Sequence, residues 1–204
     1  MTRNVGIVVY EDAEELDWVG PYEVFTMLDK VVPGSCSVFT IGHPGTEVAG
    51  AKGLRVLTDH NFVDAPGADV VIIPGGVGSR TQMKDPAMLD FVRKAAGSAE
   101  VVASVCTGAL ILAAAGLLEG RRATTHFASM DRLRAIEGVT AVEERWVDEG
   151  NVVTAVGVSA GIDMALHLVG RLWSAETAAL VQKWMQYYPS PPRQDVALPE
   201  WSTT

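Results

Sequence analysis

Cys106, one of only two cysteines in the chain, lies where two kinds of sequence meet. Val101–Val105 is a β-branched run typical of a buried strand, whereas Leu110–Leu118 is rich in alanine and leucine and favours a helix. A residue on such a turn lies at the carboxyl edge of the sheet, where open α/β folds place their ligands. N–H groups at the start of the helix, next to Thr107 and Gly108, favour a thiolate. We therefore predict a nucleophilic Cys106; the alternative is a buried cysteine that packs as a small hydrophobic residue.

A thiolate nucleophile usually works with a group that transfers protons. Asp17 is the candidate because it lies in the apolar stretch LDWVGP, a setting that raises a carboxyl pKa and allows proton donation near neutral pH. In the alternative interpretation, Asp17 only caps the helix that holds Pro21 in its first turn, and Glu14 and Glu15 are solvated charges.

Developing negative charge needs hydrogen-bond donors, which a Pro-Gly-Gly turn ending at Gly76 can supply. We predict an oxyanion hole made by backbone N–H groups of this turn, residues 74–76, together with that of Thr107. His126 follows the short segment 122–125 closely enough to reach the same sheet edge, where it lines the site or simply begins a helix. The histidines lack metal-ligand spacing, so we expect no metal and no cofactor. They are His43, His60, His126 and His167.

The charge balance excludes a nucleic-acid-binding role. The chain has 204 residues, 16 Lys and Arg against 25 Asp and Glu, and a formal net charge of -9, whereas nucleic-acid affinity comes from clustered basic residues. A hydrophobic content of 48% is typical of one globular domain. Its amino terminus lacks the apolar run of about 7–15 residues that a signal peptide needs, so we expect a cytoplasmic protein with reduced Cys36 and Cys106.

The uncharged run of residues 101–118 is long enough to raise the question of a membrane span. Its character changes at Cys106, however, and a strand followed by a helix explains that change where a single span does not. We therefore expect no membrane association.

Short Val/Ile-rich runs alternate with longer amphipathic runs, which predicts a mainly parallel sheet covered by helices. The expected strands are 5–9, 37–41, 53–58, 70–73, 101–105, 122–124, 142–146 and 152–155, with 53–58 in a hairpin or at an edge. Helices are expected over 16–28, 86–97, 110–118, 128–137, 159–172 and 175–187, the second with Asp85 as N-cap. We divide the chain into an α/β domain, 1–188, and a proline-rich arm, 189–204.

With these residues assembled, the chain resembles the DJ-1/PfpI superfamily along nearly its whole length, to about residue 187. The segments that carry the resemblance are EELDWVGPYEVF, VVIIPGGVG, VVASVCTGALILAAAGLLEGRRATTH and VGVSAGIDMALHLV. Two of them, LDWVGP and SVCTGALILAAAGLLEGRRATTH, are most similar to those of the members that hydrate isonitriles. The resemblance implies a flavodoxin-like three-layer α/β sandwich and a homodimer.

Carried over by position, the resemblance makes Cys106 the nucleophile, Asp17 the acid hydrogen-bonded to it, and the N–H groups of Gly76 and Thr107 the oxyanion donors. Thr107 would also orient the sulfur through its hydroxyl. Protease-like members have histidine after the cysteine, and Thr107 at that position counts against protease or amidase activity. The implied reaction is hydration of an isonitrile to an N-substituted formamide through a cysteine thioimidate.

Two other functions remain open at this point. One is a glyoxalase-like conversion of reactive carbonyls, for which His126 would matter more. The other is a non-catalytic sensor, in which Cys106 is oxidised or a small molecule is bound. The sensor domains of AraC-type transcription regulators share the CTG elbow, but the acidic charge and the proline-rich tail argue against DNA binding.

Overall fold

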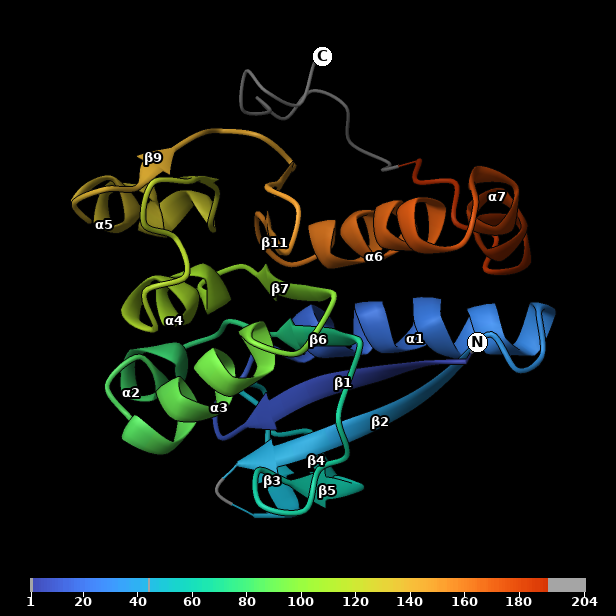
Figure 1. Ribbon diagram of the computed structural model, residues 1–204, viewed down its shortest axis with the longest axis horizontal. Helices are drawn as coiled ribbons and strands as arrows, with labels where there is room; N and C mark the ends of the chain where they lie inside the picture. The colour runs from blue at the N-terminus through green and yellow to red at the C-terminus, as the bar shows by residue number, and fades with distance from the viewer. Residues whose placement is uncertain (1, 44, 191–204) are drawn as a thin grey trace.

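The computed structural model describes residues 2–43 and 45–190, which form a central sheet of seven strands between two layers of helices (Figure 1). In spatial order the strands are β10 (Trp146–Asp148), β11 (Val152–Ala155), β7 (Val101–Val105), β6 (Val70–Ile73), β1 (Arg3–Tyr10), β2 (Cys36–His43) and β5 (His60–Asn61). All neighbours pair in parallel except β10 and β11. The fold is the flavodoxin-like three-layer α/β sandwich that the sequence predicted.

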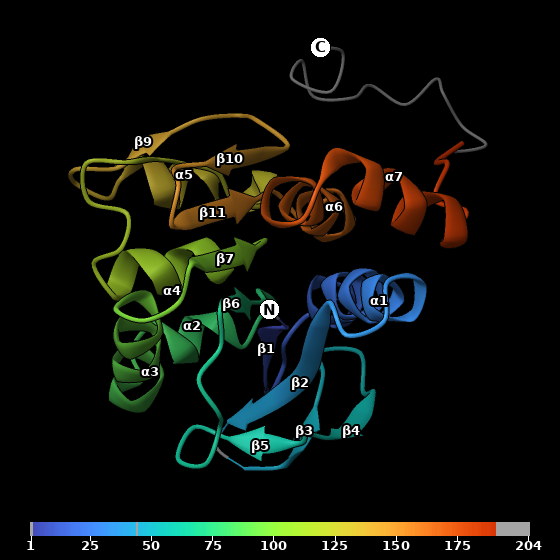
Figure 2. The same ribbon diagram turned by 45° about the vertical axis from the view of Figure 1, so that its right-hand side comes forward.

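Helices cover both faces of this sheet (Figure 2). One face carries α1 (Glu15–Val31), α6 (Ala160–Leu172) and α7 (Ala175–Trp184), which pack against one another. The other carries α2 (Ser79–Gln82), α3 (Pro86–Ala96) and α4 (Gly108–Ala114). Strands β6 and β7 are buried at every position because helices lie on both sides of them, which explains why their sequences are continuously apolar.

Several predicted elements have other boundaries in the structure. The helix expected to reach residue 118 ends at Ala114, because Gly116 adopts a φ of +86° that cannot continue a helix. The helix expected over 128–137 is a 3-10 turn, Phe127–Ser129, followed by the short α5, Met130–Arg134. Pro21 lies in the second turn of α1, not in its first.

The strand predictions near the second half of the chain need correction too. The strand expected at 142–146 begins only at Trp146, and residues 140–141 form β9 instead. β8 (Arg122–Ala123) pairs with β9 outside the central sheet. The predicted strand 53–58 is confirmed as β4 (Arg55–Leu57), which forms a hairpin with β3 (Glu47–Ala49).

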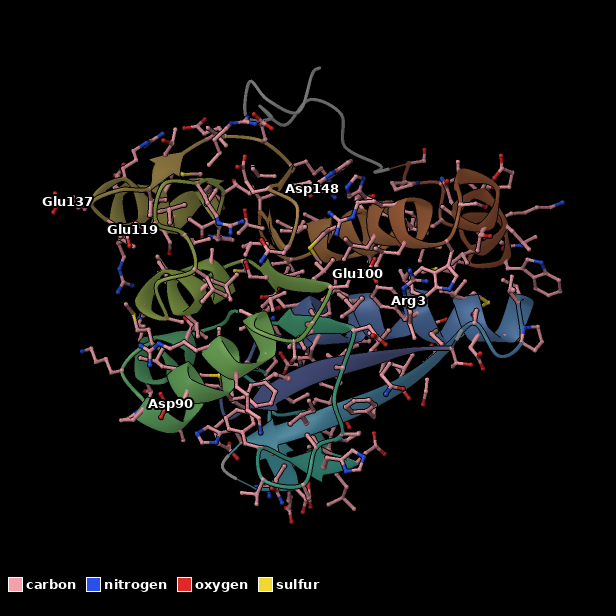
Figure 3. The ribbon with its side chains drawn as sticks, in the orientation of Figure 1. Arg3, Asp90, Glu100, Glu119, Glu137 and Asp148 are labelled. Atoms are coloured by element: carbon pink, nitrogen blue, oxygen red, sulfur yellow. The ribbon has the colours of Figure 1, made fainter. Side chains whose placement is uncertain are left out.

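The two ends of the parallel strands differ in character. At the amino ends, Arg3 at the start of β1 and Glu100 just before β7 form an ion pair at 3.0 Å (Figure 3). The turns at the carboxyl ends of β1, β6, β7 and β11 lie at the other end, where the predicted site residues are found. In the described part of the chain, no helix is both long and apolar enough to span a bilayer. The predicted arm 189–204 lies outside the described residues from 191 onward.

Candidate active site

Cys106 occupies a strained turn between β7 and α4. Its φ of +58° falls in the left-handed region that side chains rarely adopt. The surrounding backbone fixes this conformation, because the Cys106 N–H donates to the carbonyl of Ala155 at 3.0 Å and its carbonyl accepts from the Thr125 hydroxyl at 2.8 Å. A β-carbon on Gly108 would lie 2.3 Å from the carbonyl oxygen of Ile73, so only glycine fits there. Cys106 thus lies on the strand-to-helix turn that the sequence predicted.

The Pro-Gly-Gly turn after β6 lies directly against this elbow. A β-carbon on Gly75 would lie 2.4 Å from the backbone nitrogen of Thr107 and 2.9 Å from the Cys106 β-carbon. Gly76 has a φ of +108°, and a β-carbon there would lie 2.3 Å from the backbone nitrogen of Glu14. Two glycines therefore let three loops, those after β1, β6 and β7, approach to backbone contact.

Asp17 reaches the same place from the first turn of α1. Its side chain is fully buried, and Oδ2 accepts the Gly75 N–H at 2.9 Å. Oδ1 is buried with no N–H or O–H partner among the described residues. The alternative in which Asp17 caps the helix is wrong: Glu14 is the N-cap, and the Asp17 carboxyl points to the neighbouring loop.

Burial raises the pKa of the Asp17 carboxyl to about 7. The Gly75 N–H lowers it, the nearby Glu14 charge raises it, and the Cys106 thiol lowers it again by its interaction with the carboxylate. The raised pKa expected from the apolar stretch LDWVGP is confirmed. A carboxyl with a pKa near 7 can both take and give a proton at neutral pH.

The Cys106 thiol has a pKa raised to about 12, chiefly by burial and further by the negative charge of Asp17. The backbone N–H and the hydroxyl of Thr107, together with the Gly76 N–H, lower it but do not prevail. The side chain is only 6% exposed, and loss of hydration outweighs the local donors, so the Cys106 pKa shifts upward, opposite to the shift expected from the start of α4 alone.

Asp17 and Cys106 consequently behave as one titrating pair. Near neutral pH the pair loses its first proton from the carboxyl and keeps the second on sulfur. In that state a carboxylate faces a thiol, so attack by the sulfur can be coupled to transfer of its proton to Asp17. Chemically, such a pair can serve as a nucleophile that is uncharged at rest and becomes anionic only as it reacts.

The predicted oxyanion donors belong to the two loops that meet at Cys106. The N–H groups of Gly76 and Thr107 both lower the Cys106 pKa. The Gly76 N–H also donates to the Thr107 hydroxyl oxygen at 3.0 Å. The structure thus brings together four predicted residues: Cys106, Asp17, Gly76 and Thr107.

His126 lies at the same sheet edge but forms no hydrogen bond with Cys106 or Asp17 in the described structure. It begins the 3-10 turn, where its Nδ1 accepts the Ala128 N–H at 3.2 Å. A β-carbon on Gly157, which follows β11, would lie 2.3 Å from its ring. Burial lowers the pKa of the His126 imidazole, so the ring is neutral at physiological pH.

Glu14 and Glu15 are not the solvated charges of the alternative interpretation. Their side chains are only 20% and 15% exposed, and both contact Lys52 in the turn of the β3–β4 hairpin. Lys52 forms an ion pair with Glu14, and its backbone N–H donates to Glu15 Oε1 at 2.6 Å. The hairpin therefore covers the beginning of α1, the helix that carries Asp17.

Two further residues of the site were not predicted from the sequence. Tyr10, at the end of β1, is fully buried, and its hydroxyl lies 2.6 Å from the Pro74 carbonyl oxygen. Ser79, at the start of α2, has its hydroxyl 2.9 Å from that of Thr107. The only available signal was the spacing of Ser79, three residues after Gly76, which suits a turn. Within the described part of the chain, no three His, Cys, Asp or Glu side chains are grouped to hold a metal ion.

Comparisons with known proteins agree with this fold. Residues 3–171 match the model of the DJ-1/PfpI family. The chain is 41% identical to isonitrile hydratase of Pseudomonas putida over 94% of this chain and 82% of that protein. It is 28% identical to the glutathione-independent glyoxalase DJR-1.2 of Caenorhabditis elegans, over 81% of this chain and 86% of that protein. A solved structure of a ThiJ/PfpI family protein from Pseudomonas syringae superposes with a TM-score of 0.88 and 30% identity, covering 97% of this chain and 80% of that one. The chain therefore belongs to the DJ-1/PfpI family.

Proposed function

We propose that this protein hydrates an organic isonitrile to an N-substituted formamide, with Cys106 as nucleophile and Asp17 as the proton-transfer group. The observation that carries the proposal is the buried Asp17–Cys106 pair, in which one carboxylate faces one thiol at a strained elbow. The 41% identity to an isonitrile hydratase supports the choice of substrate class.

In the first half-reaction, Asp17 takes the thiol proton while the sulfur forms a bond to the terminal carbon of the isonitrile. The C–N bond order falls from three to two, and the carbon keeps a lone pair. Asp17, now a carboxylic acid, returns the proton to that carbon, which gives a thioimidate, R–N=CH–S–Cys106. Proton and electron pairs balance, and Asp17 is again a carboxylate.

In the second half-reaction, Asp17 removes a proton from a water molecule while the water oxygen attacks the thioimidate carbon. The electron pair of the C=N bond moves to nitrogen, which takes the proton. The C–S bond then breaks, the hydroxyl proton passes to the departing sulfur through Asp17, and the formamide leaves. In both half-reactions the N–H groups of Gly76 and Thr107 stabilise the negative charge that develops on the sulfur and on the atoms bonded to the carbon under attack.

Purified protein incubated with a simple aromatic isonitrile tests the proposal by formation of the formamide, followed by chromatography. We expect turnover by the wild type, none by Cys106→Ala and a large loss with Asp17→Asn, with circular dichroism spectra unchanged. Cys36→Ala is the matched control. Cys36 is buried at the start of β2, at the opposite end of the strands from Cys106, and its thiol contacts the Phe25 carbonyl. Full activity in Cys106→Ala or in Asp17→Asn would refute the mechanism.

A glyoxalase-like activity on reactive carbonyls is the second candidate. It is favoured by His126, a neutral imidazole at the same sheet edge, and by the 28% identity to a glyoxalase. Incubation with methylglyoxal, with lactate as the measured product, separates the two. Lactate without formamide, lost in His126→Ala, would favour this candidate; neither product, with selective oxidation of Cys106 by mild peroxide, would favour a sensor.

A further inference from the structure

Two hydroxyl groups, those of Ser79 and Thr107, meet at the carbonyl oxygen of Gly76. The Ser79 hydroxyl oxygen lies 2.7 Å from this carbonyl oxygen and 2.9 Å from the Thr107 hydroxyl oxygen. The Thr107 hydroxyl oxygen lies 3.1 Å from the same carbonyl oxygen. Ser79 is 1% exposed, so its hydroxyl depends on these neighbours for its hydrogen bonds.

The number of protons available decides which hydrogen bonds form among the two hydroxyl groups and the Gly76 carbonyl. A hydroxyl has one proton to donate, and a carbonyl oxygen has two lone pairs to fill. The Gly76 carbonyl already accepts the backbone N–H of Ser79 at 3.2 Å, and the Ser79 hydroxyl supplies the second and shortest hydrogen bond. The Gly76 carbonyl then has no further need of the Thr107 proton.

The proton of the Thr107 hydroxyl is thereby available to other acceptors, of which the Ser79 hydroxyl oxygen, 2.9 Å away, is one and the Cys106 sulfur another. The Thr107 hydroxyl oxygen accepts the Gly76 N–H at 3.0 Å, which holds the hydroxyl in place from the other side. Next to it is the Cys106 sulfur, whose pKa this hydroxyl lowers. A donor to an anionic sulfur is worth more than a donor to a neutral carbonyl, so the proton turns to the sulfur as negative charge develops.

We infer that Ser79 is a positioning residue for Cys106: its hydroxyl occupies the Gly76 carbonyl and so leaves the Thr107 hydroxyl free to stabilise the thiolate. In the described part of the chain the Ser79 hydroxyl bonds to the Gly76 carbonyl and the Thr107 hydroxyl and not to the sulfur, so it acts through Thr107. The kinetic consequence rests on the proposed hydration, but the effect on the thiolate does not.

Loss of the Ser79 hydroxyl would redirect the Thr107 proton. In Ser79→Ala, the Gly76 carbonyl has an open lone pair, and the Thr107 hydroxyl at 3.1 Å is the donor at hand. The thiolate then competes with this carbonyl for one proton. We expect the rate of Cys106 alkylation by iodoacetamide at pH 7 to 9 to fall about three- to tenfold, which corresponds to the net free energy of one hydrogen bond.

The experiment compares wild type, Ser79→Ala, Thr107→Val and the double variant. Alkylation is followed by peptide-resolved mass spectrometry across pH, which separates Cys106 from Cys36. Because Ser79 acts through Thr107, the double variant should react no more slowly than Thr107→Val alone. Hydration of an aromatic isonitrile should show a lower kcat for Ser79→Ala at an unchanged KM.

Ser98→Ala is the matched control, because its hydroxyl also lies near backbone carbonyls, those of Lys94 and Ala95, but at the far end of α3. It should alkylate as the wild type does. Wild-type alkylation rates in Ser79→Ala, or losses that simply add in the double variant, would overturn the inference. If the wild type makes no formamide, the proposed function fails, while the alkylation series still decides the role of Ser79.

Discussion

The Asp17 side chain is fully buried: its Oδ2 accepts the Gly75 N–H, and its Oδ1 has no N–H or O–H donor among the described residues. We therefore expect the protonation state of Asp17 to control activity. With a carboxyl pKa of about 7 and a thiol pKa of about 12, the pair carries a single proton between these values. We expect kcat/KM for isonitrile hydration to rise with pH, with a midpoint near 7, and not to fall before strongly alkaline pH. Initial rates measured from pH 5 to pH 10 test this.

Asp17→Asn should abolish this rise and lower kcat/KM by about 10²- to 10⁴-fold, the usual contribution of a positioned general acid or base. Asn leaves the Gly75 N–H with an acceptor, so the loop geometry is kept. An unchanged midpoint near pH 7 in Asp17→Asn would assign the titration to another group.

The same carboxyl should reduce the stability of the protein. Its pKa is about 7 when folded and near 3.8 when exposed, so the folded state holds the proton more tightly. The free energy of unfolding therefore falls as pH rises from about 4 to about 7, by up to about 4 kcal/mol at 1.36 kcal/mol per pKa unit. We expect Asp17→Asn to be more stable than wild type, with a gain that grows over this pH range and then stays constant.

Urea unfolding of the two proteins at pH 4, 6 and 8 measures this gain. A gain that is equal at all three pH values would mean that Asp17 does not carry its proton into the folded state. An active-site residue that costs stability is expected where function requires a buried ionisable group.

At this scale the sequence predicted Asp17 and Cys106 because each lies in an apolar run that makes a charged or reactive side chain stand out. It did not predict Ser79, since a serine after a glycine-rich turn is common and only the folded chain places it next to Thr107. It also misjudged the Cys106 pKa, because burial depends on the loops that surround the elbow.

At the scale of elements, the backbone of the turn after β6 packs directly against the backbone of the turn that holds Cys106. A β-carbon on Gly75 would lie 2.4 Å from the Thr107 nitrogen and 2.6 Å from its hydroxyl oxygen, so Gly75→Ala must shift one of the two loops. We expect at least a tenfold loss of alkylation rate at Cys106, about the effect of misplacing groups by one ångström. Thermal unfolding followed by circular dichroism shows whether the protein remains folded.

Gly67→Ala serves as the control for this variant. Its β-carbon would meet nothing within 4 Å, and its φ is not in the left-handed region, so alkylation should proceed at the wild-type rate. A wild-type rate in Gly75→Ala as well would mean that the close approach of the two loops is not needed for the reactivity of Cys106.

The sequence predicted strands best where helices cover both faces of the sheet. Very short strands were harder to predict. β6 and β7 are flanked by helices, so their apolar runs have no other interpretation. β5 and β9, which the sequence did not predict, have two residues each, too few to produce any periodic pattern. The equally short β8 was expected, at 122–124, and is present. The early end of α4 follows from the φ of Gly116, which a helical pattern does not reveal.

At the scale of the whole molecule, family resemblance leads us to expect a homodimer. Large apolar side chains are exposed on α1 and α7, two helices that contact each other; they are Leu16, Tyr22 and Trp184. Sedimentation equilibrium should give twice the chain mass of 21.7 kDa. A mass of one chain at all concentrations up to the micromolar range would contradict the expectation.

The short strands at the two sides of the sheet have a consequence for how copies of this protein can meet. The outermost strands, β5 and β10, contain two and three residues. An edge this short offers few free backbone groups for a strand of another molecule, so the sheet cannot easily be extended into a chain of molecules. The short outermost strands of the central sheet therefore protect the protein against ordered aggregation through that sheet.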